Sequence, residues 1–138
     1  MIQAVCQSVR LCDALEKEML NLFSKVVNPL DYEYSLELGS TYCIIAIEIE
    51  GFLNYVYCFN SSNRNSNYAY PFVSRYPLCL FNLNEIGDKI HSDLTITGSK
   101  IVFQDKFLSD YRNWFEAYVD GDREIEMAIR NFVEAKDG

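Results

Sequence analysis

The fold of this protein is decided by residues 42–59, which read YCIIAIEIEGFLNYVYCF. β-Branched and aromatic residues, which favour strands, dominate both Tyr42–Glu50 and Phe52–Phe59. Little more than Glu50-Gly51 separates the two runs, and so short a connection with a glycine is typical of a hairpin turn. We therefore predict two antiparallel strands joined as a β-hairpin.

Taking Glu50-Gly51 as the loop sets the register of this hairpin. Ile49 would then face Phe52, and Cys43 would face Cys58, on one side of the sheet. Such a cysteine pair leaves two alternatives, a cross-strand disulfide if the distances allow it or two buried thiols, and the buried thiols are favoured. The other side of the hairpin would carry Tyr42, Ile44, Ala46, Glu48, Leu53, Tyr55, Tyr57 and Phe59.

The residues before the hairpin change their hydrophobic period once. From Val5 to Val26 the apolar residues recur at spacings of three and four, which predicts one amphipathic helix. Asn28-Pro29 would end this helix, because proline disfavours helical geometry in the residue before it. Asp31–Leu38 then alternates polar with apolar residues, which predicts a strand with one wet and one buried face.

The residues after the hairpin begin with a polar tract, Asn60–Asn67, which predicts a loop. Tyr76–Phe81 is either a fourth strand or an extended segment near the sheet, because Pro71 and Pro77 argue against a central strand. Asn82–Ser92 is predicted to be a short helix.

The last third of the chain combines a second hairpin with helix. Leu94–Thr97 and Lys100–Phe103 are predicted strands joined through Gly98-Ser99. From Phe107 to Val133 the apolar residues again follow helical spacing, and Asp120-Gly121-Asp122 would break or kink this helix.

Together these segments predict a single α+β domain over residues 1–138. Its antiparallel sheet would have about five strands, with an N-terminal amphipathic helix, a short middle helix and one or more C-terminal helices, in the order α-βββ-(β)-α-ββ-α. With 138 residues, 49% of them apolar, the chain can bury a core without disulfides or metals.

The charge balance argues against several classes of partner. Twelve basic and 20 acidic residues give a net charge of −8, which would repel a phosphate backbone, so direct nucleic-acid binding is not expected. No run approaches the roughly 18 to 20 apolar residues of a membrane span, and no signal peptide is recognised. We therefore expect no membrane partner and a cytoplasmic location, where the five cysteines would be reduced thiols.

No motif in the sequence names a reaction, and we assign no catalytic, cofactor-binding or metal-binding residue. His91, the only histidine, lies in a polar stretch where a surface or helix-capping role outweighs catalysis. The acidic stretch Asp120–Glu126 lacks the glycine spacing of an EF-hand, and Asp122 is better interpreted as a helix N-cap. Glu48 and Glu50 would lie about 7 Å apart on one strand face, where solvated carboxylates are expected rather than a glycosidase pair.

The feature with most weight is the second side of the central hairpin, which we predict to bind a partner. The predicted partner-binding residues are Tyr42, Ile44, Glu48, Leu53, Tyr55, Tyr57 and Phe59. No basic residue occurs between Lys25 and Arg64, whereas five acids do. Aromatic rings rimmed by acids suit a protein interface, because rings supply contact area and the charge steers a basic partner. The alternative is that a C-terminal helix covers this side as ordinary core, since Trp114 must also pack.

A family resemblance rests on Leu83–Ile86, followed by Leu94–Phe103. The order of elements around them resembles the type III secretion chaperone-like superfamily, including its bacterial sensory-transduction-regulator branch. The resemblance covers nearly the whole chain as topology, and about residues 83–107 as sequence. It implies a small acidic protein, usually a homodimer, that binds another polypeptide and catalyses nothing.

The function we predict is that of a non-enzymatic, acidic, chaperone-like protein that holds or masks a partner polypeptide. The alternative is an inhibitor, such as an immunity or anti-defence protein, whose acidic surface blocks a basic partner such as a nuclease. A small hydrolase ranks last, because no catalytic constellation supports it.

Overall fold

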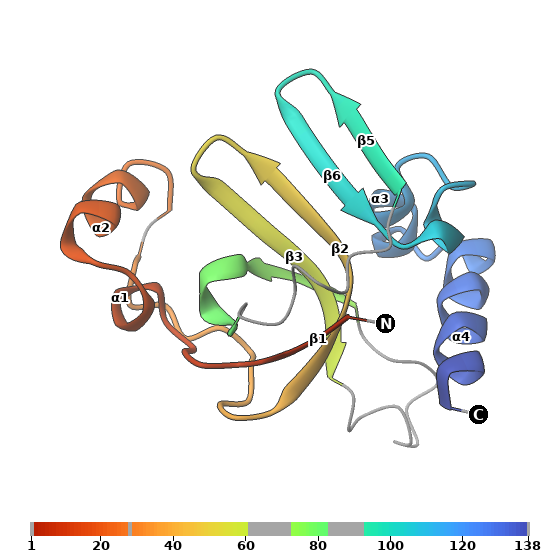
Figure 1. Cartoon of the computed structure of the whole chain (residues 1–138), viewed down its shortest axis with the longest axis horizontal. Helices are drawn as coiled ribbons and strands as arrows, with labels where there is room; N and C mark the ends of the chain where they lie inside the picture. Colours follow the sequence, from red (N-terminus) through yellow and green to blue (C-terminus); the bar gives the residue numbers. More distant parts are fainter. Residues whose placement is uncertain (1, 28, 61–72, 83–92, 138) are drawn as a thin grey trace.

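A computed structural model describes residues 2–27, 29–60, 73–82 and 93–137 of the chain. It confirms the α+β prediction, because an antiparallel sheet, six-stranded within these ranges, packs with helices (Figure 1). The predicted loop after Asn60, the predicted helix after Asn82 and His91 all lie outside the described residues.

The elements follow one another in a mixed order along the chain. The strands are β1 (Ile2–Val5), β2 (Thr41–Glu50), β3 (Leu53–Asn60), β4 (Ser74–Pro77), β5 (Asp93–Thr97) and β6 (Lys100–Gln104). The helices are α1 (Leu11–Ala14), α2 (Lys17–Phe23), α3 (Trp114–Val119) and α4 (Arg123–Asp137), with single 3-10 turns η2 (Leu78–Leu80) and η4 (Lys106–Leu108). In the sheet the order is β4-β3-β2-β6-β5, and β1 pairs separately with β2.

The central strand β2 is paired on both edges. One edge pairs with β3, and the other is shared between β1, which pairs at Thr41–Ile44, and β6, which pairs at Ala46–Ile49. Between these two regions the register against β3 shifts at Ile45, which is a β-bulge. The bulged carbonyl of Ile45 accepts a hydrogen bond of 2.9 Å from the Asp105 N–H, so the irregular position is still satisfied.

The β2–β3 hairpin is confirmed, but its predicted register is wrong. The loop is Gly51-Phe52, and Ile49 lies opposite Asn54 rather than Phe52. The reason is the turn: Gly51 has φ +61, and a positive φ at the first loop residue alone is what a type II′ turn requires.

The register also separates the two cysteines that were predicted to face each other. Cys43 lies opposite Phe59, whereas Cys58 lies opposite Ile44. Both cysteines are buried and neither forms a disulfide, so the disulfide alternative does not hold.

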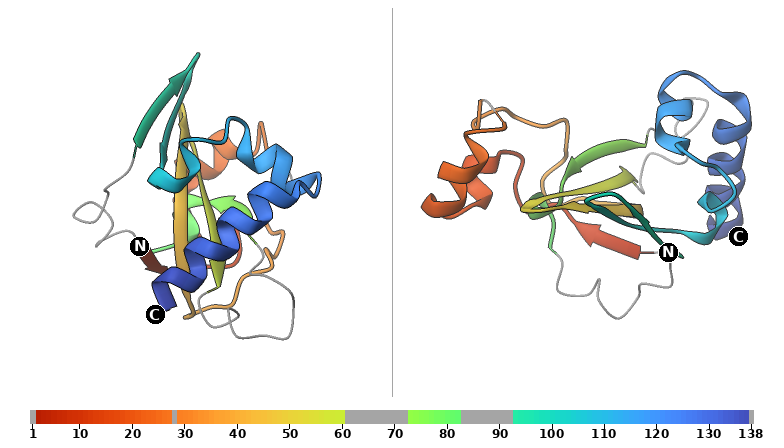
Figure 2. Two further views of the ribbon diagram at one scale, coloured as in Figure 1. Left: turned by 90° about the vertical axis from the view of Figure 1, so that its right-hand side faces the viewer. Right: turned by 90° about the horizontal axis from the view of Figure 1, so that it is seen from above.

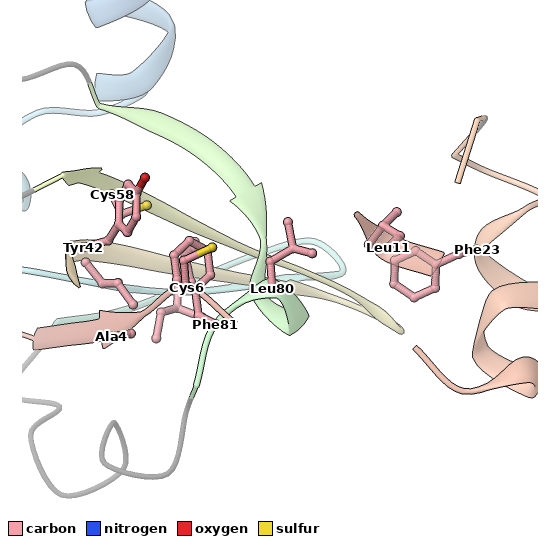
Figure 3. Packing of buried hydrophobic residues seen from close by; sticks show 11 residues of the cluster. Ala4, Cys6, Leu11, Phe23, Tyr42, Cys58, Leu80 and Phe81 are labelled. Atoms are coloured by element: carbon pink, nitrogen blue, oxygen red, sulfur yellow. The ribbon is translucent and has the colours of Figure 1, made fainter. Parts of the chain in front are cut away.

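The sheet carries a hydrophobic core on each of its two faces (Figure 2). The bulge at Ile45 reverses the alternation of β2, so it decides which side chains of β2 enter which core. The first cluster lies on the side of α1 and α2 and contains Ala4, Cys6, Leu11, Phe23, Tyr42, Ile44, Ile47, Val56, Cys58, Leu80 and Phe81. The second lies on the side of α3 and α4 and contains Cys43, Ile45, Ala46, Tyr57, Phe59, Val73, Leu108, Trp114, Ile125, Ile129 and Val133. Figure 3 shows the first cluster, with Leu80 between the residues near Tyr42 and the pair Leu11 and Phe23.

The prediction of one helix from Val5 to Val26 is wrong. Residues 2–5 form β1, and an extended backbone at Leu15 and Glu16 separates α1 from α2. Residues 2–5 pair with the part of the β2 edge that β6 does not reach, and this pairing buries Ala4 and the adjacent Cys6. The predicted stripe is buried only in part: Val9, Leu15 and Met19 pack against the first cluster, whereas Val5 and Val26 are 41% and 57% exposed.

The predicted strand at Asp31–Leu38 is also absent. Burial does alternate there, because Tyr34 and Leu36 are half-buried between exposed neighbours. However, the Tyr34 N–H donates to the Val9 carbonyl and the Glu37 N–H to the Tyr42 hydroxyl, which makes isolated contacts and not a ladder. The sequence pattern therefore predicted correctly which side chains are more buried, but it gave no information on whether another strand pairs with this segment.

The later elements agree better with prediction. The segment predicted at Tyr76–Phe81 is a short edge strand, as expected from the proline, but it spans Ser74–Pro77, and Leu78–Leu80 form a 3-10 turn instead. β5 and β6 join through Gly98-Ser99, as predicted. The C-terminal helix breaks between α3 and α4, where the Asp122 carboxylate accepts a 2.9 Å hydrogen bond from the Glu124 N–H as the predicted N-cap.

Packing of α4 on the sheet can be tested with two residues of that helix. Ile129 is 1% exposed within the second cluster, whereas Met127 is 48% exposed. Ile129→Ala should lower the free energy of unfolding by about 2–5 kcal/mol in urea titration, because it leaves a cavity. The control Met127→Ala should change it by less than about 0.5 kcal/mol. Equal small effects would mean that α4 does not pack as described.

The half-buried and buried thiols should make the fold sensitive to alkali. Burial raises the pKa of the Cys79 thiol from 9.0 to about 11, and burial also raises the pKa of Cys58. A raised folded-state pKa means that the unfolded chain loses its protons first, so stability present below pH 9 is lost as the pH rises from about 9 to 11. The free energy of unfolding should therefore fall between pH 8 and pH 10.

The Cys79 contribution to this fall can be isolated by substitution. Cys79→Ala should reduce the fall by on the order of 1 kcal/mol, since partial solvent exposure weakens the effect. Cys12→Ala removes an exposed thiol and should keep the whole fall. A stability that stays constant from pH 8 to pH 10 in the parent protein would contradict the described burial.

Candidate functional site

The seven residues predicted to form one partner-binding face do not share a face. Tyr42 and Ile44 belong to the first cluster and Leu53 packs against it, whereas Tyr57 and Phe59 belong to the second cluster under α3 and α4. Five of the seven are buried: Tyr42, Ile44, Glu48, Tyr57 and Phe59. The physical reason is the bulge at Ile45, which moves the start of β2 to the opposite side of the sheet. The covered-core alternative therefore describes Tyr57 and Phe59.

Glu48 is the one charged member of the seven, and it is buried, at 7% exposed. The Tyr57 hydroxyl donates to Glu48 Oε2 at 2.8 Å, and Arg75 Nη2 donates to Glu48 Oε1 at 3.4 Å. Lys100 Nζ lies 3.8 Å from the same Oε1 and 3.6 Å from Glu50 Oε2. These residues come from β4, β3, β2 and β6, so the network ties four neighbouring strands together.

Aromatic rings hold this network in place. The Arg75 guanidinium lies 3.9 Å from the centroid of the Tyr55 ring, and Tyr57 packs edge-on against Trp114 and Phe115 at 5.3 and 4.8 Å. Burial, followed by the hydrogen bond to Glu48, raises the pKa of the Tyr57 hydroxyl, which keeps it a donor at neutral pH. The network is therefore a structural brace, by which we mean a set of side-chain contacts that stabilises the sheet across its strands. Tyr55 and Glu48, two of the predicted partner-binding residues, contribute to this brace.

The brace predicts unequal roles for its two glutamates. Glu48→Gln removes the charge that Arg75 and Lys100 share, and should lower the free energy of unfolding by about 1–3 kcal/mol. The control Glu50→Gln removes only an exposed contact to Lys100 and should cost less than about 0.5 kcal/mol. Urea unfolding of both variants measures the difference, and equal losses would contradict the assigned brace.

The sheet has two ends along its main path, and they differ in how they are protected. β4, at one end, is four residues long and carries Arg75 and Pro77, both of which hinder pairing with another chain. β5, at the other end, reads Asp-Leu-Thr-Ile-Thr, with no lysine, proline or bulge. Within the described ranges β5 pairs with β6 alone, so its outer edge is open (Figure 1).

Exposed aliphatic side chains accompany this open edge. Leu94 and Ile96 are 56% and 67% exposed, and they lie opposite Phe103 and Ile101 of β6. Ile101 is itself 38% exposed. We call Leu94–Thr97, together with Ile101 and Phe103, the β5 edge. Its apolar face continues the first cluster, because Phe103 packs against that cluster.

The hairpin turn fixes which backbone groups of β5 point outward. Gly98, at φ +60, starts a two-residue loop, so Thr97 and Lys100 exchange backbone hydrogen bonds across the hairpin. Hydrogen-bonded and non-hydrogen-bonded pairs alternate along an antiparallel ladder. The N–H and C=O groups of Leu94 and Ile96 therefore point away from β6, toward the open edge.

The β5 edge offers backbone hydrogen-bonding groups and aliphatic surface, which is the chemistry that binds another strand. Within the described ranges, no group of three or more His, Cys, Asp or Glu side chains is placed to hold a metal ion. The sequence did predict Leu94–Thr97 as a strand of a hairpin. It did not predict that this strand ends the sheet, because edge position depends on which strands pair and not on the strand itself.

Comparison with known proteins gave no match to a protein-family model, a curated protein or a solved structure. The resemblance to the type III secretion chaperone-like superfamily therefore stays a prediction. In the described part of the chain, no helix combines the length and the apolar character that crossing a membrane would require.

Proposed function

We propose that this protein is a non-enzymatic, chaperone-like binding protein that holds or masks a polypeptide by pairing it, as an added strand, with the β5 edge. The observation that carries the proposal is the open edge of β5, with Leu94 and Ile96 largely exposed on it. Natural proteins usually protect such an edge, so an unprotected one suggests a use.

Strand addition divides the work between backbone and side chains. The outward N–H and C=O groups of Leu94 and Ile96 would supply main-chain hydrogen bonds, and the alternation of side chains would supply specificity. The bound segment would place apolar residues on the side of Ile96 and Ile101. On the side of Thr95 and Thr97, both exposed, it would place polar residues.

Charge supports a partner with basic character. The net charge of −8 steers basic segments toward the protein, mainly by raising the association rate. None of the five cysteines forms a disulfide, which fits a reducing compartment such as the cytoplasm, and we propose the cytoplasm as the location.

The second candidate function, an inhibitor of a basic protein such as a nuclease, has one observation in its favour. Six exposed acids lie within residues 13–37, and they are Asp13, Glu16, Glu18, Asp31, Glu33 and Glu37. Arg10 pairs with Glu33 at 3.1 Å and with Asp13 at 3.9 Å, and residues 10–37 hold three basic side chains against these six acids. An inhibitor would bind through these acids, away from the β5 edge, and its complex would weaken with salt.

The proposed function can be tested with a displayed library of random peptides of about 12 residues. Peptides selected on the protein should alternate apolar and polar residues. Ile96→Lys should weaken their binding by about tenfold or more, because it charges the apolar side of the edge. Val119→Lys is the matched control, since Val119 is 66% exposed on α3 and should tolerate the change with no loss of affinity.

Two results would contradict strand capture at β5. Selected peptides that bind the Ile96→Lys variant as tightly as the parent would place the binding surface elsewhere. A tight, salt-sensitive complex with a folded basic protein, unaffected by Ile96→Lys, would favour the inhibitor.

A further inference from the structure

We propose that the polypeptide held at the β5 edge contains, beside its added strand, an amphipathic α-helix with a basic polar side, and that this helix covers the aliphatic face of β5 and β6. This inference rests on the proposed function, because it names the class of polypeptide that the same site takes. It is drawn from side chains that an added strand cannot cover.

The two faces of the β5–β6 hairpin differ in polarity. One face is entirely apolar and carries Leu94, Ile96, Ile101 and Phe103. The opposite face is mostly polar and carries Thr95, Thr97, Lys100, Val102 and Gln104. A pair of strands with one apolar and one polar face is typical of a sheet whose apolar face is packed against a second layer.

The chain supplies this second layer for only part of the sheet. The first cluster reaches as far as Ile49 of β2 and Phe103 of β6, which pack against it. Beyond them, Ile96 and Ile101 are exposed. Figures 1 and 2 show α1 and α2 toward β3, on the far side of β2 from β5 and β6. Among the described residues, no helix therefore covers β5 and β6 on this face.

A strand added at the β5 edge would leave Ile101 uncovered. Ile101 lies in β6, between Ile49 of β2 and Ile96 of β5. Neighbouring strands are about 4.8 Å apart, so the added strand would run about 10 Å from β6. Its side chains would contact those of β5 and not Ile101. Covering Ile101 therefore requires an element stacked on the face of the sheet.

The dimensions of the uncovered face match one α-helix. The face is two strands wide, about 10 Å, and strands of five residues are about 17 Å long. A helix of about 11 residues is also about 10 Å wide and 17 Å long. A second β-layer of this width would expose two strand edges of its own, which a helix does not.

Charge selects the polar side of this helix. The six exposed acids within residues 13–37 belong to a segment whose Tyr34 and Leu36 pack against the first cluster. They therefore lie on the same side of the sheet as the uncovered face. Lys100 lies on the opposite face, where it pairs with Glu48 and Glu50. Basic side chains on the helix would be attracted, and acidic ones repelled.

Synthetic probes test this inference. The first probe is a strand peptide selected from the library, and the second joins this peptide through a glycine linker to a helix of about 11 leucines and lysines. A third probe has the helix residues permuted, so that no apolar stripe remains. The second probe should bind the parent protein about tenfold or more tightly than the other two, mainly by dissociating more slowly.

A substitution in β6 shows where the helix binds. Ile101→Asn should abolish the gain in affinity from the helix and leave the affinity of the strand peptide unchanged, because the strand does not reach β6. Retained binding of the strand peptide also shows that the variant folds. Thr95→Asn, on the opposite face of the hairpin, is the control and should keep the gain.

The charge of the helix is tested with a fourth probe, in which glutamates replace the lysines. It should bind several-fold more weakly than the lysine probe in dilute buffer, and the difference should shrink at about 0.5 M salt, where charges are screened. Equal affinity of the two probes in dilute buffer would overturn the basic partner.

Thiol reactivity measures coverage of the face directly. Ile101→Cys, in a Cys12→Ser background that removes the exposed cysteine, should react quickly with a soluble thiol reagent in the free protein. The strand–helix probe should protect this thiol, and the strand peptide alone should not. Slow reaction in the free protein would mean that the chain covers this face itself, and would overturn the inference.

The outcomes separate this inference from the proposed function. Strand peptides that bind at β5 but gain nothing from the helix would overturn the inference and keep strand capture. Binding of the helix alone, lost in Ile101→Asn, without binding of any strand peptide would overturn strand capture and keep the aliphatic face as a helix site. Absence of binding by both parts would overturn both proposals.

Discussion

The structure depends on one strand whose two edges are both used. β2 pairs with β3 on one side and is divided between β1 and β6 on the other, with the bulge at Ile45 at the division. The bulge adds one residue to β2, and the Asp105 N–H satisfies its carbonyl. Without this bulge, the side chains of β2 would alternate regularly along the whole strand, and those at its start would lie on the opposite face of the sheet, in the other cluster.

Two consequences for function follow from this division. The aromatic side chains of β3 that seemed suited to a partner, Tyr57 and Phe59, are occupied in packing against α3 and α4. The Glu48 network then braces the strands from β4 to β6. Of the two end strands of the main path, β4 carries Arg75 and Pro77, whereas β5 carries neither lysine nor proline; within the described ranges the outer edge of β5 is unpaired, and Leu94 and Ile96 are exposed there.

The sequence predicted those elements whose signals are local. Both hairpins and the break before α4 follow from glycine turns and from the Asp122 cap, each contained within a few residues. The bulge at Ile45 has no such signal, because an Ile-Ile run fits a regular strand equally well. The predicted partner-binding face assumed a regular strand, and it was therefore wrong. The prediction for the N-terminal segment was wrong for a related reason. The spacing of its apolar residues suits a helix, but Ile2–Val5 pair with the free edge of β2 and form a strand.

The central claim is that β5 is paired on one side and open on the other, and hydrogen exchange of single backbone amides tests it most directly. In dilute protein the amides of Leu94 and Ile96 should exchange quickly, whereas that of Thr95, bonded to β6, should exchange slowly. Slow exchange of all three amides in dilute monomer would mean that the chain covers this edge itself, and would contradict the account.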